Sequence, residues 1–185
     1  FISFDDGANW MPFQMNLPIT SIRDLHVRDN NLIAATHGRS FWILDDLTPL
    51  HQLNDKVIGA DFFLFQPKDS YRMAQGAGRG TDFRKEGENH PDGVLFHYMI
   101  NNWDEEDEVK LEIREADDDL IQTFSTKGKE DQALEAALGG NRFVWDMRYP
   151  GFKTFDGLIL YSSPNRGPKA PPGTYKATLT INGES

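Results

Sequence analysis

The chain has 185 residues, a formal net charge of −10 at pH 7 and no cysteine, and 38% of its residues are hydrophobic. This length is sufficient for one full domain and a piece of a second, with a buried core. The acidic balance argues against binding to nucleic acid or to an anionic membrane surface, and the absence of cysteine excludes a disulfide scaffold, a zinc ribbon and a cysteine nucleophile.

The sequence starts at Phe1, without an initiating Met, in a stretch that has the pattern of a strand. We find no signal peptide in it and no apolar run long enough to cross a bilayer, so we expect no membrane span. We interpret the chain as a piece of a longer protein, cut at both ends.

The first motif along the chain is Ser-x-Asp-x-Gly-x-x-Trp, formed by Ser3, Asp5, Gly7 and Trp10. It predicts a hairpin turn in which Asp5 accepts backbone N–H groups, Gly7 takes a positive φ and Trp10 opens the next strand. The spacing resembles the Asp-box of bacterial neuraminidase-type repeats. That resemblance implies a structural role, because Asp-boxes lie at the periphery of a β-propeller, away from its central site.

Three strands are expected after this turn, at residues 22–27, 32–36 and 41–44, and residues 37–40 form the tip of the second hairpin. Apolar residues on both faces of the third segment predict a strand that is covered on both sides. This close succession of short strands and turns is typical of a propeller blade. Because a partial blade cannot close a propeller, we expect residues 1–48 to leave apolar edges that pack on the following domain or on a second copy.

A connector is predicted at residues 49–60, followed by a second domain at residues 61–185 with a mobile Gly-rich loop at 74–93. Residues 129–138 are the one expected helix, ended by a Gly-Gly pair. Alternating apolar residues predict half-buried antiparallel strands, with Trp145 facing the core. The expected strands are residues 62–65, 94–100, 109–114, 120–124, 143–147 and 174–181, with shorter candidates at 71–73 and 158–161. About seven strands separated by turns describe an immunoglobulin-like or fibronectin-type sandwich.

The order of several motifs resembles a known family. Residues 3–10, 17–25 and 35–46 resemble the last blade of large bacterial proteins with sortilin-like Asp-box (BNR) repeats, which are often labelled glycosyl hydrolase-like. Residues 89–93, 140–150 and 171–175 resemble the all-β module that follows that propeller. The fold class expected is therefore all-β, with one or more incomplete β-propeller blades followed by an immunoglobulin-like antiparallel β-sandwich. The resemblance also implies a periplasmic or secreted, extracytoplasmic location.

Ser40 departs from the pattern of this family, in which many relatives are expected to carry Gly at that position. The departure concerns only the type of turn in the second hairpin.

Two pairs of residues are candidates for contact with a ligand. His37 and Arg39, at the hairpin tip, could hold an anionic group such as a carboxylate, although a solvated turn is the favoured interpretation. Trp103 and Phe152 lie in or beside long loops, together with other aromatic residues, and could stack on a sugar or on a partner protein.

The acidic residues favour structural interpretations. Asp5 and Asp6 are neighbours on the chain and point to opposite faces, so they are poorly placed to share one sugar as a carboxylate pair. The runs at 104–108 and 117–119 lack the ligand spacing of a calcium loop. We assign no catalytic residue, no metal site and no cofactor.

The leading functional hypothesis is a non-catalytic accessory module of a secreted Asp-box propeller protein, which supports the propeller or binds a partner. The expected partners are the rest of the parent propeller, a glycan or peptide, and a second copy through exposed blade edges, but no nucleic acid. An alternative is a fragment of a glycoside hydrolase whose catalytic carboxylates lie upstream of this chain. A third hypothesis is a carbohydrate- or protein-binding module that uses the loop aromatics.

Overall fold

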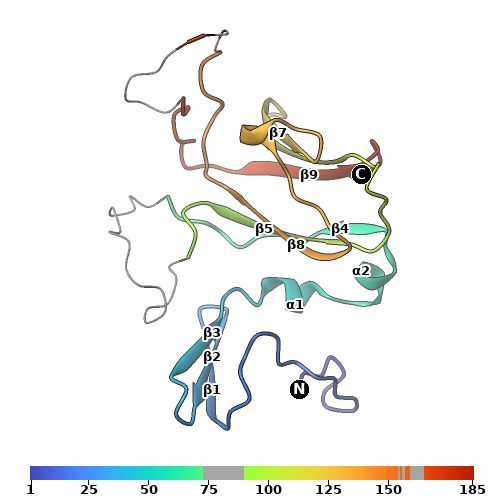
Figure 1. Cartoon of the computed structure of the whole chain (residues 1–185), viewed down its shortest axis with the longest axis vertical. Coiled ribbons are helices and arrows are strands. Elements are labelled where there is room, and N and C mark those ends of the chain that lie inside the picture. Colours follow the sequence, from blue (N-terminus) through green and yellow to red (C-terminus); the bar gives the residue numbers. More distant parts are fainter. Residues whose placement is uncertain (73–89, 154, 156, 159–164) are drawn as a thin grey trace. The chain divides into compact units, whose positions relative to one another are not determined.

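The structure is a computed structural model that describes residues 1–72, 90–153, 155, 157, 158 and 165–185. The described chain is mostly β-sheet, with three antiparallel sheets of three strands each and a few short helices (Figure 1). It divides into two compact units, Phe1–Leu47 and Thr48–Ser185. The prediction of a β-rich chain is therefore confirmed.

The first unit contains β1 (Ile22–Arg28), β2 (Asn31–Thr36) and β3 (Phe41–Leu44), in the order β1-β2-β3. The tight turn between β1 and β2 has φ of 49° at Asp29 and 62° at Asn30. Positive φ at two successive residues is the geometry of a two-residue hairpin whose twist matches that of its strands, and Asn and Asp tolerate it well. The three strands predicted in this part of the chain are confirmed.

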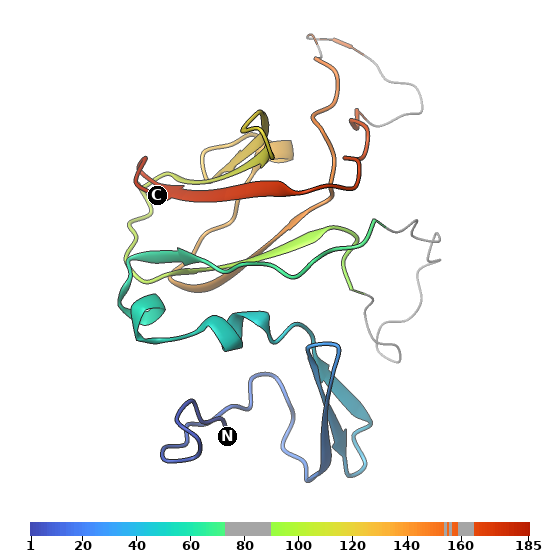
Figure 2. The ribbon, with the colours of Figure 1, turned by 180° about the vertical axis from the view of Figure 1, so that it is seen from behind.

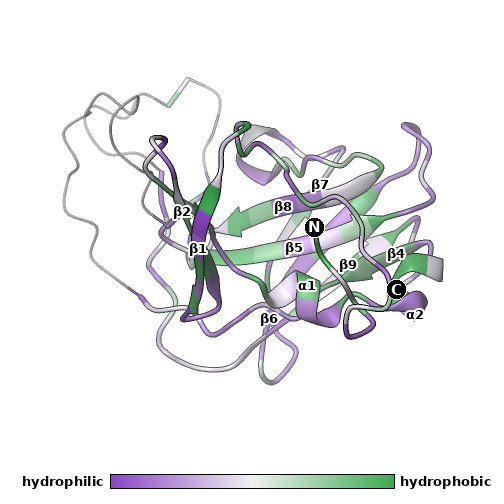
Figure 3. Ribbon diagram, turned by 90° about the horizontal axis from the view of Figure 1, so that it is seen from below, coloured by the Kyte–Doolittle hydropathy of each residue, from purple (hydrophilic) through white to green (hydrophobic). Residues whose placement is uncertain are grey.

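Both faces of this sheet carry apolar side chains. Leu25 lies opposite Ala34 and therefore shares one face with it, whereas Ile43 lies opposite Ile33 on the other face. The alternation of hydrophobic and hydrophilic residues along β1 is visible in Figure 3. The prediction that β3 is covered on both sides is wrong for this chain, since Phe41 is 71% exposed. The first unit contains no other sheet or helix among its elements to cover that face.

The second unit begins with two short helices, α1 (Thr48–Gln52) and α2 (Asp55–Gly59), in the segment predicted to be a connector. The Asn54 side chain caps α2 by accepting hydrogen bonds from the Lys56 and Val57 backbone N–H groups. This satisfies two of the backbone donors that the first turn of a helix leaves unpaired. At the other end of α2, the Asn101 side-chain amide donates to the Ala60 carbonyl at 2.7 Å.

Two sheets follow. One has the order β4-β5-β8, with β4 (Phe62–Leu64), β5 (Val94–Ile100) and β8 (Gly139–Trp145); the other has the order β7-β6-β9, with β6 (Val109–Glu115), β7 (Leu120–Ser125) and β9 (Tyr175–Ile181). Figure 2 shows these sheets from behind. Burial alternates along β6 and β9, as the sequence pattern predicts for strands with one face on a core.

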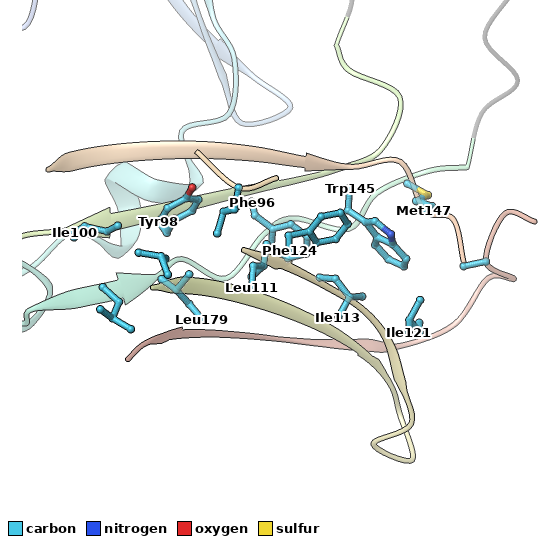
Figure 4. Packing of buried hydrophobic residues seen from close by; sticks show 14 residues of the cluster. Phe96, Tyr98, Ile100, Leu111, Ile113, Ile121, Phe124, Trp145, Met147 and Leu179 are labelled. Atoms are coloured by element: carbon cyan, nitrogen blue, oxygen red, sulfur yellow. The ribbon is translucent and has the colours of Figure 1, made fainter. Parts of the chain in front are cut away.

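The two sheets enclose one hydrophobic core, and Figure 4 shows its side chains pointing into the space between them. Tyr98 and Ile100 are completely buried, and Trp145 is 2% exposed, so the prediction that Trp145 faces the core is confirmed. The Trp145 ring meets the Tyr175 ring edge to face with centroids 5.6 Å apart, an arrangement that the quadrupoles of aromatic rings favour. The other buried members are Phe96, Val109, Leu111, Ile113, Ile121, Phe124, Leu134, Met147, Ala170, Leu179 and Ile181.

The prediction of a helix at residues 129–138 is wrong. Only a single turn of 3-10 helix, η1 (Glu130–Gln132), forms there. Ala133 makes a parallel bridge with Ser125, and the Leu134 N–H donates to the Ser125 carbonyl at 3.0 Å, which places Leu134 in the core. Pairing with the end of β7 therefore overrides the local helical propensity, and the Gly-Gly pair begins β8.

Three other expectations concern the irregular segments. Tyr71 and Arg72 do not form the strand considered for 71–73. Most of the loop predicted at 74–93 and most of the strand considered at 158–161 lie outside the described residues.

Candidate functional site

The Asp-box residues form one turn that is held by its own hydrogen bonds. The Ser3 hydroxyl donates to Asp5 Oδ1 and its oxygen accepts the Gly7 N–H, both at 2.8 Å. The Trp10 indole N–H donates to the Gly7 carbonyl at 3.0 Å, which lays the ring over this glycine. Asp6 and Gly7 have φ of 54° and 90°, so the chain reverses tightly here. The structure brings all four residues of the motif together.

The Asp5 carboxylate is the acceptor at the centre of this turn. Hydrogen bonds from the Asn9 backbone, the Asn9 side chain and the Ser3 hydroxyl lower the pKa of Asp5 below its ordinary value of 3.8, because each of them favours the ionised form. Both carboxylate oxygens accept bonds from within the turn. This arrangement serves to hold the reversal together.

His37 lies at the tip of the second hairpin beside Arg23, which the sequence interpretation did not single out. An Arg23 guanidinium nitrogen lies 3.3 Å from His37 Nδ1, and a guanidinium can only donate in such a contact. The register of β1 shifts between Ile22 and Asp24, and such a bulge redirects the side chain of the extra residue. The tip thus carries two basic groups in contact, His37 and Arg23.

Arg39, the other candidate at this tip, takes part through its backbone. Its N–H donates to the Thr36 hydroxyl at 3.1 Å, and its carbonyl accepts the Trp42 indole N–H at 3.0 Å. Ser40 has φ of 64°, the left-handed region in which Gly is preferred. These contacts account for the shape of the tip but do not close a pocket around it.

Trp103 and Phe152 occupy different surroundings. Trp103 packs against the core, and its indole N–H is buried without a partner among the described residues. Phe152 is 55% exposed, in a loop where the Asn165 side chain accepts the Phe152 N–H and donates to its carbonyl.

The strand register separates these two aromatics. Ile100 pairs with Gly139 and Val94 with Trp145, so the chain leaves β5 and β8 at opposite ends of the pair. Trp103 follows β5 and Phe152 follows β8. Seven residues of strand measure about 20 Å, so one sugar ring cannot stack on both.

The acidic runs show no arrangement for a metal ion. Within the described ranges, no group of three or more His, Asp or Glu side chains could hold one. Asp107 accepts from the Asn182 side chain, which lowers the pKa of Asp107, and Lys176 bonds Asp118 at 2.7 Å. In the same described part of the chain, no helix is long and apolar enough to cross a membrane.

A large cavity opens in the second unit between β4 and β9. Its volume is about 960 Å³. Residues 62–72 form one wall and residues 170–179 the other, while the buried side chains of Phe96, Ile113 and Trp145 lie at its floor. β4 and β9 are the outer strands of their sheets and lie near each other, as the view in Figure 2 shows. The cavity is therefore a groove at an open edge of the two-sheet unit, and it reaches the core.

The groove has apolar walls and a rim of mixed charge. Phe62, Leu64 and Tyr175 lie along it, and Lys68, Asp69 and Arg72 extend its wall beyond β4. Neither of these two cations forms an ion pair within the described residues. A pocket of this size, with apolar walls and a few polar groups, is a candidate ligand-binding site.

No protein-family model, curated protein or solved structure matches this chain. The function is therefore inferred from the geometry and from the residues themselves.

The groove between β4 and β9 was missed at the level of sequence. The segments that form its walls are separated by about a hundred residues of chain. In addition, apolar and polar side chains alternate along β9 in the same way as they would along a central strand, so the pattern does not reveal an edge. A usable signal was the break at Pro67, which indicates that β4 is short and lies at an edge.

Proposed function

We propose that this chain is a non-catalytic interaction module of an exported Asp-box β-propeller protein. In this proposal the first unit supplies strands of a propeller blade, and the second unit, an immunoglobulin-like sandwich, supports the propeller or binds a protein partner. The extracytoplasmic location rests on the resemblance of the motifs at residues 3–10 and 35–46.

The observation that carries the proposal is the exposure of apolar side chains on both faces of β1-β2-β3. On one face Leu25 and Val27 are each 59% exposed, and on the other Phe41 and Ile43 are 71% and 58% exposed. Large exposed apolar patches on soluble proteins usually mark interaction sites. Sheets that pack face to face at a distance of about 10 Å would bury both faces. A blade in a propeller lies between two neighbouring blades in this way.

The Asp-box turn supports the scaffold role of the first unit. Its polar side chains form hydrogen bonds within the turn, and both oxygens of the Asp5 carboxylate accept such bonds. A carboxylate that serves in glycoside hydrolysis must instead face the sugar as an acid, a base or a nucleophile.

A contact in the second unit supports the immunoglobulin-like interpretation. The Tyr175 hydroxyl donates to the carbonyl of Pro171, four residues upstream, at 2.6 Å. A tyrosine near a strand start that bonds back to the upstream backbone is a recurring corner of immunoglobulin-like sandwiches.

The test of the interaction role is sedimentation velocity together with binding of an apolar dye. The chain is expected to bind the dye and to self-associate as its concentration rises, because no blade covers the first sheet. The double variant Phe41→Lys, Ile43→Lys is expected to lose both properties. Its matched control is Ile58→Lys, which places a charge on a 59% exposed residue of the second unit and should change neither.

A chain that stays monomeric at high concentration and binds no dye would overturn this proposal. Amide hydrogen exchange distinguishes this outcome from an unfolded first unit, because protected β2 amides report that the sheet has formed.

A further inference from the structure

We propose that the groove between β4 and β9 binds an extended peptide segment of a partner protein, which adds as a strand to the free edge of β9. The segment carries apolar side chains at alternating positions and acidic side chains beside them. This inference rests on the interaction role proposed for the second unit and names the chemistry of its partner.

The first argument comes from the backbone of β9. The Asn182 N–H donates to the Glu108 carbonyl at 3.0 Å, which fixes the even-numbered residues of β9 as those bonded to β6. The N–H and C=O groups of Tyr175, Ala177 and Leu179 therefore point away from β6, toward the free edge. β9 pairs only with β6 among the described strands. A row of such groups is a template for another strand.

The cavity runs along this edge. Consecutive residues of β9, from Tyr175 to Leu179, all lie on its wall. Since neighbouring side chains in a strand point to opposite faces, consecutive residues share only their edge. At the far end Ile181 is already paired, since its N–H donates to the Glu184 carbonyl and its carbonyl accepts the Glu184 N–H. The free template thus extends over five residues, Tyr175 to Leu179.

The opposite wall is less suited to strand addition. β4 has only three residues. The chain beyond it cannot continue as a paired strand through Pro67, because Pro has no N–H group to donate. The Gln52 side-chain amide already pairs with the Gln66 backbone, donating to its carbonyl and accepting its N–H, both at 2.9 Å. This amide occupies the place of a neighbouring strand, so β9 is the edge that remains for a peptide.

The floor and rim determine the side chains of the peptide. Phe96, Ile113 and Trp145 at the floor are each at most 4% exposed, so side chains that enter the groove meet an apolar surface. Lys68 and Arg72 lie on the wall of the groove with one carboxylate, Asp69, between them in sequence, so this wall segment is net positive in a chain whose net charge is −10. Alternating apolar residues with flanking carboxylates complement both features.

The experiment uses the full chain and a fluorescein-labelled heptapeptide, acetyl-Asp-Val-Thr-Val-Thr-Val-Asp-amide, in an anisotropy titration. Two further peptides are N-methylated, one at the three Val residues and the other at the two Thr residues. In an antiparallel addition the Val N–H groups face β9, whereas in a parallel addition the Thr N–H groups do. Saturable binding below about 1 mM is expected. One methylated peptide should lose this binding while the other retains it, and this reports the direction of the added strand.

Two protein variants locate the site. Ala177→Pro removes an N–H that faces the free edge and leaves the bonds to β6 in place, a position at which edge strands accept Pro. Loss of one backbone hydrogen bond should weaken peptide binding about fivefold. The variant Lys68→Glu, Arg72→Glu should also weaken binding, and more so at low salt. Its control is Lys153→Glu, Arg166→Glu, which makes the same charge change at exposed residues outside the groove.

Equal binding of all three peptides, or binding unchanged in both groove variants, would overturn the proposal. So would a chain that dimerises through β9 and does not exchange its partner for the peptide, because the occupant would then be a second copy. If Ala177→Pro fails to fold, the charge variants and the methylated peptides still decide the outcome. Failure here is distinct from failure of the blade role, since the variant Phe41→Lys, Ile43→Lys lies in the first unit and should bind the peptide normally.

Discussion

Asn9 holds the carboxylate of Asp5 with two hydrogen bonds, from its backbone N–H to Oδ1 at 2.8 Å and from its side-chain Nδ2 to Oδ2 at 2.6 Å. These bonds lower the pKa of Asp5 below 3.8. A carboxyl group with a lowered pKa stabilises the folded turn above its unfolded pKa, and that contribution is lost as the pH falls through the folded value.

We therefore expect the Asp-box turn to keep its structure at neutral pH and to loosen only when the pH falls below 3.8. The measurement is an NMR titration that follows the Asp5 carboxyl carbon and the Gly7 amide. The Asp5→Asn variant is the control, because it keeps the shape and removes the titrating group. An Asp5 carboxyl group that titrates at or above 3.8 would contradict the hydrogen-bond geometry.

Gly7→Ala is expected to destabilise the same turn by about 1 kcal/mol, because a Cβ disfavours positive φ. Gly7 has φ of 90°, and a Cβ there would meet only the Trp10 ring at an ordinary contact distance of 3.6 Å. The cost is therefore conformational. Hydrogen exchange of the Asn9 amide measures it. The matched control is Gly59→Ala, since Gly59 has open space around it. Equal effects of the two substitutions would show that φ is not the cause.

Gly93→Ala is expected to destabilise the second unit by at least about 2 kcal/mol. A Cβ at Gly93 would lie 2.3 Å from the Trp145 carbonyl oxygen, a backbone atom that cannot move without disturbing the pairing of β5 and β8. Urea unfolding measures the loss. Gly140→Ala, in the same pair of strands but with no atom within 4 Å, should leave the stability nearly unchanged. A small effect at Gly93 would mean that β5 and β8 can separate locally.

Tyr98→Phe is expected to cost about 1 kcal/mol, because it removes the hydrogen bond from the Tyr98 hydroxyl to the Glu135 carbonyl and leaves that carbonyl unpaired. Burial raises the pKa of Tyr98 to about 12. The stabilisation from a raised pKa is complete below the unfolded pKa of 10.0 and is lost as the pH rises through 12.

The test for Tyr98 is thermal unfolding of the variant, together with an alkaline absorbance titration of the phenols. One phenol that ionises near pH 12 should disappear in the variant. Tyr71→Phe is the control for stability, because Tyr71 is 81% exposed and loss of its hydroxyl should leave the unfolding temperature unchanged. A Tyr98→Phe variant as stable as the parent would mean that water replaces the hydroxyl at the Glu135 carbonyl.

Local patterns were sufficient to predict several parts of this fold. The Ser3 to Trp10 motif closes as a turn because its donors and acceptors lie within eight residues of one another. The period of two along Val109, Leu111 and Ile113 specifies which face of β6 is buried, because side chains in a strand alternate.

Other parts depended on partners that are distant in sequence. Residues 129–138 have a local preference for helix, but the backbone of Ser125 offers Leu134 a hydrogen bond and a place in the core. Arg23 contacts His37 across the hairpin, at the point where the register of β1 shifts. Neither outcome can be read from the residues concerned, since the competing interaction comes from another strand.

The sequence by itself determined the β-rich class, the Asp-box turn, most strand positions and the buried face of strands such as β6 and β9, because these depend on short-range periodicity and turn chemistry. Apart from the break at Pro67, which marks β4 as an edge strand, only the tertiary structure decided which strands lie at the edges of their sheets and where the two sheets remain open. β4 and β9 form the walls of one groove because each pairs with a single neighbour. Strand order is set by long-range pairing, and the alternation of side chains does not encode it.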